Sequence, residues 1–284
     1  MIAATTIARS LFAIALLSGA TVDSAPAAPN NAPTRQAPAH IKTRVNRKDG
    51  AVMVYVPAGA FLMGAEDGEG EENEHPQHAV YLDGYWIYKD DVTVGQYRKF
   101  CKATGRKMPV APSSGWNDDH PVVNVTWYEA KSYCAWAGAS LPTEAQWEKA
   151  ARGTDGRMYP WGNDWDRTKA HTKVVGGLFV LVMVLGRIGT TPVGSYPAGA
   201  SPYGCLDMAG NVWQWCADWE DNDYYAHSPG RNPAGPVTGT AREARGAAWD
   251  GSDGYFFRCA SRGRSSPGRG GELLGFRCAV RAGG

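Results

Sequence analysis

The sequence lacks three features that would place it in common functional classes. It has no apolar run of about 20 residues, the length that crosses a bilayer, because its apolar segments at 11–17 and 178–185 are short. No CxxC pair occurs, and no histidine lies at zinc-ligand spacing from a cysteine, which argues against structural zinc. The formal net charge is only +1. We therefore expect no nucleic-acid partner and no transmembrane span in the mature chain.

Glycine, proline and tryptophan are abundant. The 284 residues include 35 Gly, 18 Pro and 11 Trp, a composition that favours ordered, irregular loops over a helical bundle. The length fits one large domain with its own core. Short helical and strand-like segments alternate without an internal repeat. We therefore predict a single α+β domain over residues 48–284.

The N-terminal residues have the pattern of an exported protein. Arg9 precedes the apolar run 11–17 and small residues follow, which predicts a secretory signal peptide over residues 1–27; a disordered tail is the alternative. The Ala- and Pro-rich segment 28–47 predicts a disordered tether. The location expected is periplasmic or extracellular. The second apolar run, 178–185, is read as a buried strand or an insertion.

The first half of the domain carries local signals for strands. Alternating and β-branched residues predict a hairpin of residues 53–57 and 60–64, and a further strand over 80–87. Between them, the acidic, Gly-rich residues 66–74 predict a solvated loop. An alternative interpretation is that this segment binds a metal ion through Glu74, His75 and His78, but we favour the solvated loop.

Three short helices are predicted from their starting residues. Thr93, Thr126 and Thr143 each precede a Glu or Gln by three positions. This spacing is that of a capping box, in which the two side chains satisfy backbone N–H groups reciprocally. Apolar residues follow at helical spacing in each case.

Several segments in order resemble the formylglycine-generating enzyme, or sulfatase-modifying factor, family. The resemblance covers nearly all of residues 50–280 and rests on GAFLMG at 59–64, HPVVNVTW at 120–127, LPTEAQWE at 141–148, PWGN at 160–163, DMAGNVWQW at 207–215 and GFRC at 275–278. It implies an irregular C-type-lectin-like α+β fold stabilised by calcium. The family's enzymes oxidise a sulfatase cysteine to formylglycine with copper and oxygen.

The sequence departs from this family where copper would bind. Soft thiolates hold Cu(I), and the resemblance places two cysteines just upstream of Phe257, but residues 246–256 contain none. Ala248 stands at an active-site Ser position and Leu273 at an Asn position, whereas Trp213 and Arg262 match active-site positions. We therefore expect no copper cofactor and leave open whether the protein is an enzyme.

The resemblance also implies a calcium site and a disulfide. The calcium ligands would be Asp207, the carbonyls of Gly210 and Val212, and Gln214, which stands where the family has Glu. Loss of that carboxylate should weaken an all-oxygen site.

The cysteine pairing is only partly implied. Six cysteines in an exported chain favour disulfides. The resemblance implies a bond between Cys134 and Cys278. Cys259 is assigned provisionally to Cys216, while Cys101 and Cys205 stay unassigned or free.

The last segment predicts where a ligand binds. Residues 247–284 have no Asn but many Gly, Ser, Asp and Arg, the composition of exposed loops on a rigid frame. It is similar to the variable tails of diversity-generating-retroelement proteins, which display diversified residues on this fold; a tolerant surface is the alternative. The expected pocket residues are Trp213, Trp249, Asp250, Ser252, Asp253, Tyr255, Arg262 and Ser265.

Two functions from different classes follow. The favoured one is binding of a protein or small-molecule ligand by an exported, monomeric domain. The rival is a formylglycine-generating or cysteine-independent oxidase that acts on a secreted substrate. An envelope structural protein is the third class considered.

Overall fold

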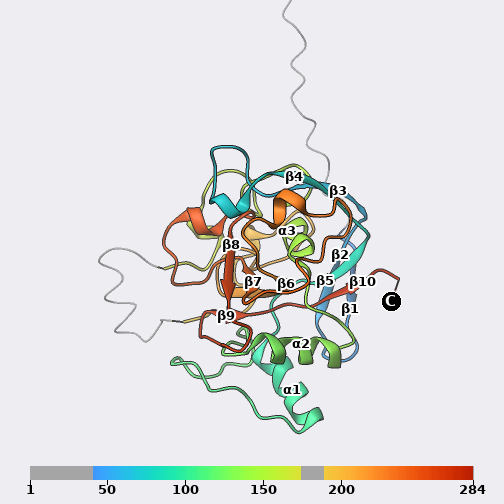
Figure 1. Ribbon diagram of the computed structural model, residues 1–284. Coiled ribbons are helices and arrows are strands. Elements are labelled where there is room, and N and C mark those ends of the chain that lie inside the picture. The colour runs from blue at the N-terminus through green and yellow to red at the C-terminus, as the bar shows by residue number, and fades with distance from the viewer. Residues whose placement is uncertain (1–40, 174–188, 284) are drawn as a thin grey trace, which may run out of the picture. The chain divides into compact units, whose positions relative to one another are not determined.

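A computed structural model describes residues 41–173 and 189–283 of the chain, which belong to one compact unit, residues 40–284 (Figure 1). Within it, short helices and small sheets combine in the expected α+β architecture. The expected signal peptide, most of the expected tether and the apolar run 178–185 lie outside the described residues.

The first sheet joins the two ends of the described chain. Its order is β1 (Thr43–Val45), β2 (Val52–Val56), β5 (Tyr85–Tyr88) and β10 (Ala279–Arg281), and all neighbours are antiparallel. β1 falls inside segment 28–47, so the part of that segment from residue 40 onward belongs to the compact unit rather than to a disordered tether.

A separate two-stranded sheet pairs β3 (Gly59–Met63) with β4 (His78–Leu82). The predicted hairpin of residues 53–57 and 60–64 is therefore wrong, because β2 and β3 belong to different sheets. The predicted strand 80–87 is likewise two strands, β4 and β5, separated at Gly84. A Cβ at Gly84 would lie 2.4 Å from the Tyr55 hydroxyl, so a larger residue here would displace the Tyr55 side chain.

The third sheet has four strands. Its order is β8 (Arg262–Ser265), β7 (Arg242–Arg245), β6 (Trp213–Trp219) and β9 (Leu274–Gly275). β6 and β9 are parallel, and the other pairs are antiparallel. β8 is an edge strand, so one of its sides faces loops rather than another strand.

The three predicted helices are confirmed. They are α1 (Val94–Thr104), α2 (Trp127–Trp136) and α3 (Glu144–Arg152), and each begins with the expected capping box. Such an N-cap stabilises a helix by about 1 kcal/mol. In Figure 1, α1 and α2 lie together at one end of the domain, whereas α3 contacts β3, β6 and β7.

Short 3-10 turns join these elements. They are η1 (Glu72–Glu74), η2 (Arg167–Lys169), η3 (Pro197–Gly199), η4 (Tyr224–His227) and η5 (Gly254–Phe257).

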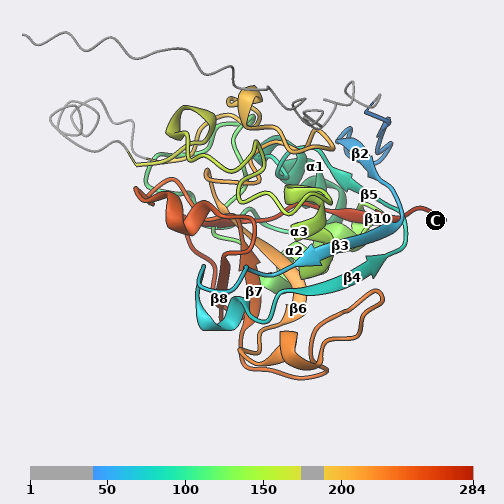
Figure 2. The same ribbon diagram turned by 90° about the horizontal axis from the view of Figure 1, so that it is seen from above.

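Three apolar clusters hold the described part of the domain together. The first includes residues of α2, the second includes residues of α3, and the third surrounds Tyr159 and Phe257. Figure 2 shows these two helices from above. In the first, Tyr97 of α1 stacks on Tyr133 of α2 with ring centroids 5.6 Å apart, and Phe276 packs against both rings. The second surrounds Trp147 of α3, which is fully buried. None of the helices in the described residues has both the length and the apolar character needed to cross a membrane.

Candidate functional site

A hollow of about 400 Å³ opens between β8 and the loop that leads into β9. Its walls come from β6, β7 and β8, from η5, and from the Gly-rich residues 269–274. The lining residues are Trp213, Ala244, Phe256, Arg262, Gly263, Arg264, Ser265, Arg269, Gly270, Gly271, Leu273 and Leu274. This volume lies in the range of small-molecule sites. We call it the β8 pocket.

The indole of Trp213 packs on the backbone of β8. A Cβ at Gly263 would lie 2.7 Å from the Trp213 ring, so a side chain at that position would displace the ring. Gly263 pairs in register with Ala244 of β7, which is also small. Small residues on two strands therefore make the room that the half-buried indole occupies.

The structure brings only part of the expected pocket together. Trp213, Arg262 and Ser265 line the β8 pocket. The others do not line it: Trp249, Asp250, Ser252, Asp253 and Tyr255.

Those remaining residues have other surroundings. The Tyr255 hydroxyl donates to Glu71 at 2.8 Å, and the backbone N–H of Trp249 donates to the carbonyl of Asn211. Asp250, Ser252 and Asp253 are exposed.

Sequence reasoning missed several lining residues. Phe256, with 49% of its surface exposed, lines this pocket together with Arg264 and Arg269. An aromatic residue within a Gly- and Ser-rich loop was the available signal for Phe256. Nothing local distinguished the two arginines from others that are exposed.

The guanidinium of Arg262 is bound by acceptors of the protein itself. Its side chain is 1% exposed. Nε donates to Glu144, and the two terminal nitrogens donate to the carbonyls of Asn73 and Asp221 and to the carboxylates of Glu144 and Glu243. All five N–H groups have acceptors on four separate segments. Arg262 therefore fixes the wall of the β8 pocket rather than offering it a free cation.

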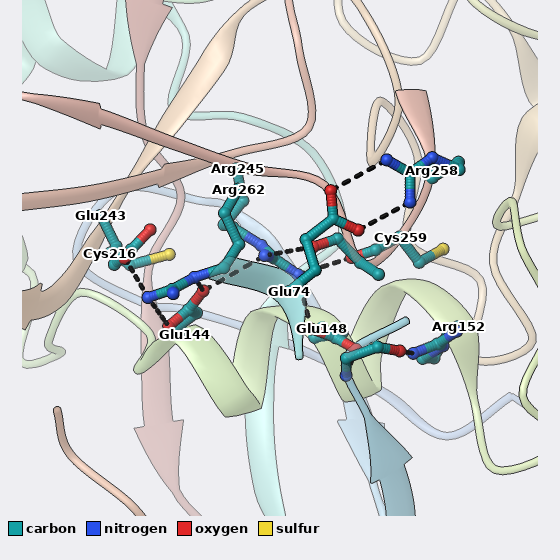
Figure 3. A network of polar contacts seen from close by, with 12 residues as sticks. Glu74, Glu144, Glu148, Arg152, Cys216, Glu243, Arg245, Arg258, Cys259 and Arg262 are labelled. Atoms are coloured by element: carbon teal, nitrogen blue, oxygen red, sulfur yellow. Dashed lines mark hydrogen bonds and ion pairs between the residues drawn. The ribbon is translucent and has the colours of Figure 1, made fainter. Parts of the chain in front are cut away.

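This contact belongs to a buried ionic network at the start of α3 (Figure 3). Glu144 and Glu148 lie one turn apart on α3 and both accept from Arg245 of β7, at 3.2 and 2.6 Å. Arg152 also donates to Glu148, at 2.7 Å. These side chains are almost inaccessible to water, so each charge depends on its partners.

The acidic loop of residues 66–74 also contributes a buried ion pair. Glu74 is fully buried and accepts two hydrogen bonds from Arg258, at 2.6 and 2.8 Å. The prediction of a solvated loop over residues 66–74 is therefore wrong at its end. Among the described residues, no three His, Cys, Asp or Glu side chains gather to hold a metal ion, and Glu74 with His75 and His78 forms no such group.

Electrostatics divide the carboxyl groups of the network. Burial opposes ionisation of Glu144, but the neighbouring Arg262 and Arg245 outweigh it and lower its pKa. Burial and the nearby Glu144 raise the pKa of Glu243 well above its ordinary value. The same two causes raise the pKa of Asp218 to about 7. Glu243 and Asp218 thus take up protons more readily than Glu144 does.

A second hollow, of about 510 Å³, lies on the other side of β8. It shares Arg262, Gly263 and Arg264 with the first, but its other walls are Glu71, Glu72, Asn73, Glu220, Asn222 and Asp223. In contrast, the lining of the β8 pocket contains no Asp or Glu. β8 thus lies between an acidic hollow, lined by four carboxylates, and the β8 pocket, which is lined by none.

Comparisons with known proteins agree with this architecture. The profile of the sulfatase-modifying factor enzyme 1-like domain matches residues 38–282. The chain belongs to this family. The formylglycine-generating enzyme of Thermomonospora curvata is 35% identical over 283 residues, which cover 80% of this chain and 93% of that protein.

Other family relatives differ in size and name. A protein of Chlamydia caviae named serine/threonine-protein kinase pkn1 is 36% identical over 252 residues, and the match spans 80% of this chain but 37% of that protein. The solved structure of PvdO from Pseudomonas aeruginosa superposes with a TM-score of 0.71 and 29% identity, covering 84% of this chain and 98% of PvdO. The family and its lectin-like fold are therefore shown.

The calcium ligands implied by the family do not fit an ion as they lie here. Gln214 is fully buried, and its Oε1 accepts from Trp147 Nε1 at 2.7 Å and from Arg277 Nε at 2.6 Å. Since both partners can only donate, the amide orientation is determined, and Nε2 donates to the carbonyl of Asp207 at 2.6 Å. A donor thus faces the position where calcium needs an oxygen.

A guanidinium lies beside this set instead. Arg277 is fully buried and donates to the carbonyls of Tyr88, Lys89 and Leu206 and to the carboxylate of Asp91. Asp207 accepts from the backbone N–H of Gly194 at 2.7 Å, and burial raises its pKa to about 6. In this member of the family, the backbone N–H of Gly194 and the side chains of Gln214 and Arg277 donate hydrogen bonds to Asp207.

The six cysteines do not fit a copper site that a substrate can reach. All six are buried, and none lines the β8 pocket. Burial raises the pKa of Cys205 to about 11 and of Cys259 to about 12, so neither forms a thiolate readily. The sulfurs of Cys134 and Cys278 lie 3.2 Å apart, but in the apolar core.

Proposed function

We propose that this chain is an exported binding domain of the sulfatase-modifying factor family, and that its ligand enters the β8 pocket. The observation that carries the proposal is the pocket itself. It holds about 400 Å³ between an aromatic floor at Trp213 and a Gly-rich wall at residues 269–271. Concave sites that combine apolar walls with a few polar groups are the usual form of ligand sites.

The cysteine positions support binding rather than formylglycine generation. The expected copper chemistry needs two thiolates at the substrate. Here the thiols lie in the core, and the segment 246–256, where the resemblance would place the pair, has no cysteine. Export is supported by the pattern of residues 1–27, and N-terminal sequencing of the mature protein tests it.

Two glycines allow a direct test of the pocket. A Cβ at Gly271 or at Gly268 would meet no atom within 4 Å, and neither residue has a positive φ. Gly271 lines the β8 pocket, whereas Gly268 does not. Gly271→Leu should therefore fill the pocket without strain, and Gly268→Leu is its matched control.

The experiment is ligand-observed NMR with a fragment library. We expect fragments that bind the natural protein to be lost in Gly271→Leu and retained in Gly268→Leu. Equal melting temperatures of the three proteins will show that folding is not the cause. Fragments that bind both variants equally well would contradict the proposed site.

The second candidate is a formylglycine-generating activity. It is favoured by 35% identity to the Thermomonospora curvata enzyme over 93% of that protein. It requires an arrangement of thiols different from the one seen here, and conversion of a sulfatase-type peptide tests it.

A further inference from the structure

The arginines that line the β8 pocket differ in whether the protein already provides acceptors for their guanidinium groups. Three arginines line it and no carboxylate does. The charge of Arg262 is offset by Glu144, and its guanidinium also donates to Glu243. Arg264 is 3.0 Å from Glu220 and also donates to Asn222. These two guanidinium groups are thus already engaged with acceptors of the protein.

Arg269 is the exception. Its side chain is exposed, and within the described part of the chain no carboxylate or carbonyl accepts from its guanidinium. Only its backbone is held, by the hydrogen bond from its N–H to the carbonyl of Ser266. The pocket therefore has one positive charge without a counter-charge at its rim.

The opposite walls are apolar and partly open to water. Phe256 is 49% exposed, Leu273 and Trp213 are half-buried, and Leu274 is buried. A flat apolar group placed here would remove surface of all three from water, at roughly 25 cal/mol per Å². A guanidinium binds carboxylate, sulfonate or phosphate oxygens in a planar, bidentate manner.

We propose that the β8 pocket selects a small molecule with a flat apolar part and an anionic group, and that Arg269 binds the anion. This inference rests on the proposed function, because it names the ligand class of the same pocket. The apolar part lies between Trp213 and Phe256, and the anion points to the Gly-rich wall. The acidic hollow across β8 repels the same anion, so the ligand is directed to one side of the strand.

Two dyes of matched shape test the class. The anionic probe is 8-anilinonaphthalene-1-sulfonate, and the neutral probe is N-phenyl-1-naphthylamine, which lacks the sulfonate. Both are titrated by fluorescence into the full chain and into four variants. Arg269→Gln removes the proposed anion ligand, and Arg167→Gln removes an exposed arginine outside the pocket. Gly271→Leu and Gly268→Leu are the pocket variant and its control.

The proposal predicts a specific pattern. Arg269→Gln should weaken the anionic probe about tenfold, as expected for one charge-assisted hydrogen bond, and leave the neutral probe unchanged. Added salt should weaken only the anionic probe. Arg167→Gln and Gly268→Leu should change neither probe, whereas Gly271→Leu should weaken both.

The other outcomes separate the two proposals. If both probes bind the pocket equally and Arg269→Gln has no effect, the anionic class is overturned while binding at the pocket stands. If neither probe responds to Gly271→Leu, this ligand class is overturned, and the fragment experiment alone decides whether the pocket binds anything.

Discussion

Gln214 accepts a hydrogen bond from Arg277 at 2.6 Å, a contact that joins the start of β6 to the segment before β10 inside the core. Trp147 of α3 donates to the same oxygen. Because two obligate donors hold this oxygen, the amide NH₂ group faces the carbonyl of Asp207. A neutral side chain thus closes the region where the family resemblance implies a cation.

This geometry predicts that calcium does not stabilise the protein. We expect the melting temperature to be the same in calcium and in a chelator. In Gln214→Glu, a carboxylate oxygen would replace the NH₂ donor and face the Asp207 carbonyl. That variant should lose about 2 kcal/mol without a cation and recover part of it with calcium. A calcium-dependent rise for the natural protein would contradict the account.

The network around α3 predicts that Arg262 contributes to stability whether or not a ligand is bound. Arg262→Gln leaves Glu144 with one arginine partner fewer and Glu243 with none from β8. Loss of about 3 kcal/mol is expected, because a buried charge loses its partner. Chemical denaturation measures it.

Arg264→Gln is the control for that measurement. Its side chain on the same strand is 56% exposed, so the loss should stay within about 1 kcal/mol. Equal losses for the two variants would mean that the network is not held as described.

Asp218 predicts a pH dependence of stability. Its pKa is raised by burial and by Glu144 to about 7 in the folded protein, from an ordinary value of 3.8. The folded state therefore binds more protons than the unfolded chain between these values, and stability falls as the pH rises from about 4 to about 7. Asp218→Asn keeps an acceptor for the Glu144 N–H and removes the titration.

The difference between the two proteins isolates this group. Asp218→Asn should be more stable than the natural protein at pH 8, by up to about 4 kcal/mol, and nearly equal to it at about pH 3.5, below the ordinary pKa of the carboxyl group. Asp223→Asn, at an exposed carboxylate, should change neither value. Parallel stability curves for the natural protein and Asp218→Asn would refute the assignment.

The thiols of Cys134 and Cys278 predict a redox-dependent stability. Their sulfurs lie 3.2 Å apart and their positions differ by 144 residues. A disulfide between them would tie α2 to the C-terminal segment and add up to about 5 kcal/mol in the chain-entropy description. Oxidised protein should yield the cross-linked peptide, and reductant should lower its melting temperature.

Two cysteine variants make that test specific. Cys278→Ala should abolish the effect of reductant, whereas Cys205→Ala, in the second apolar cluster, should retain it. A cross-link found only between other cysteines, such as Cys216 and Cys259, would contradict the pairing.

Local signals predicted the helices but not the partners of the strands. Each capping box, at Thr93, Thr126 and Thr143, involves residues only three positions apart. The sequence alone was therefore sufficient to predict where these helices begin. The sequences of β2 and β3 also have the pattern of strands, yet β2 pairs with β1 and β5. β5 begins 29 residues after the end of β2. Alternation identifies a strand without identifying its neighbour.

At the candidate site, too, the sequence predicted some residues and not others. Trp213 and Arg262 were expected at the pocket and line it. The burial of Glu74 was not predicted, because it depends on Arg258, 184 residues away. Trp249 was expected to line the pocket and does not, since nothing in a loop sequence determines which side of the sheet its side chains reach.

We propose that the β8 pocket binds a ligand, and we expect that the protein does not generate formylglycine. The most direct measurement is mass spectrometry of a sulfatase-type cysteine peptide after incubation with the purified protein, copper, calcium and oxygen. A characterised formylglycine-generating enzyme, run in parallel, confirms that the conditions support the reaction. The account predicts that the peptide mass stays unchanged with this protein. Conversion of the peptide cysteine to an aldehyde would contradict it.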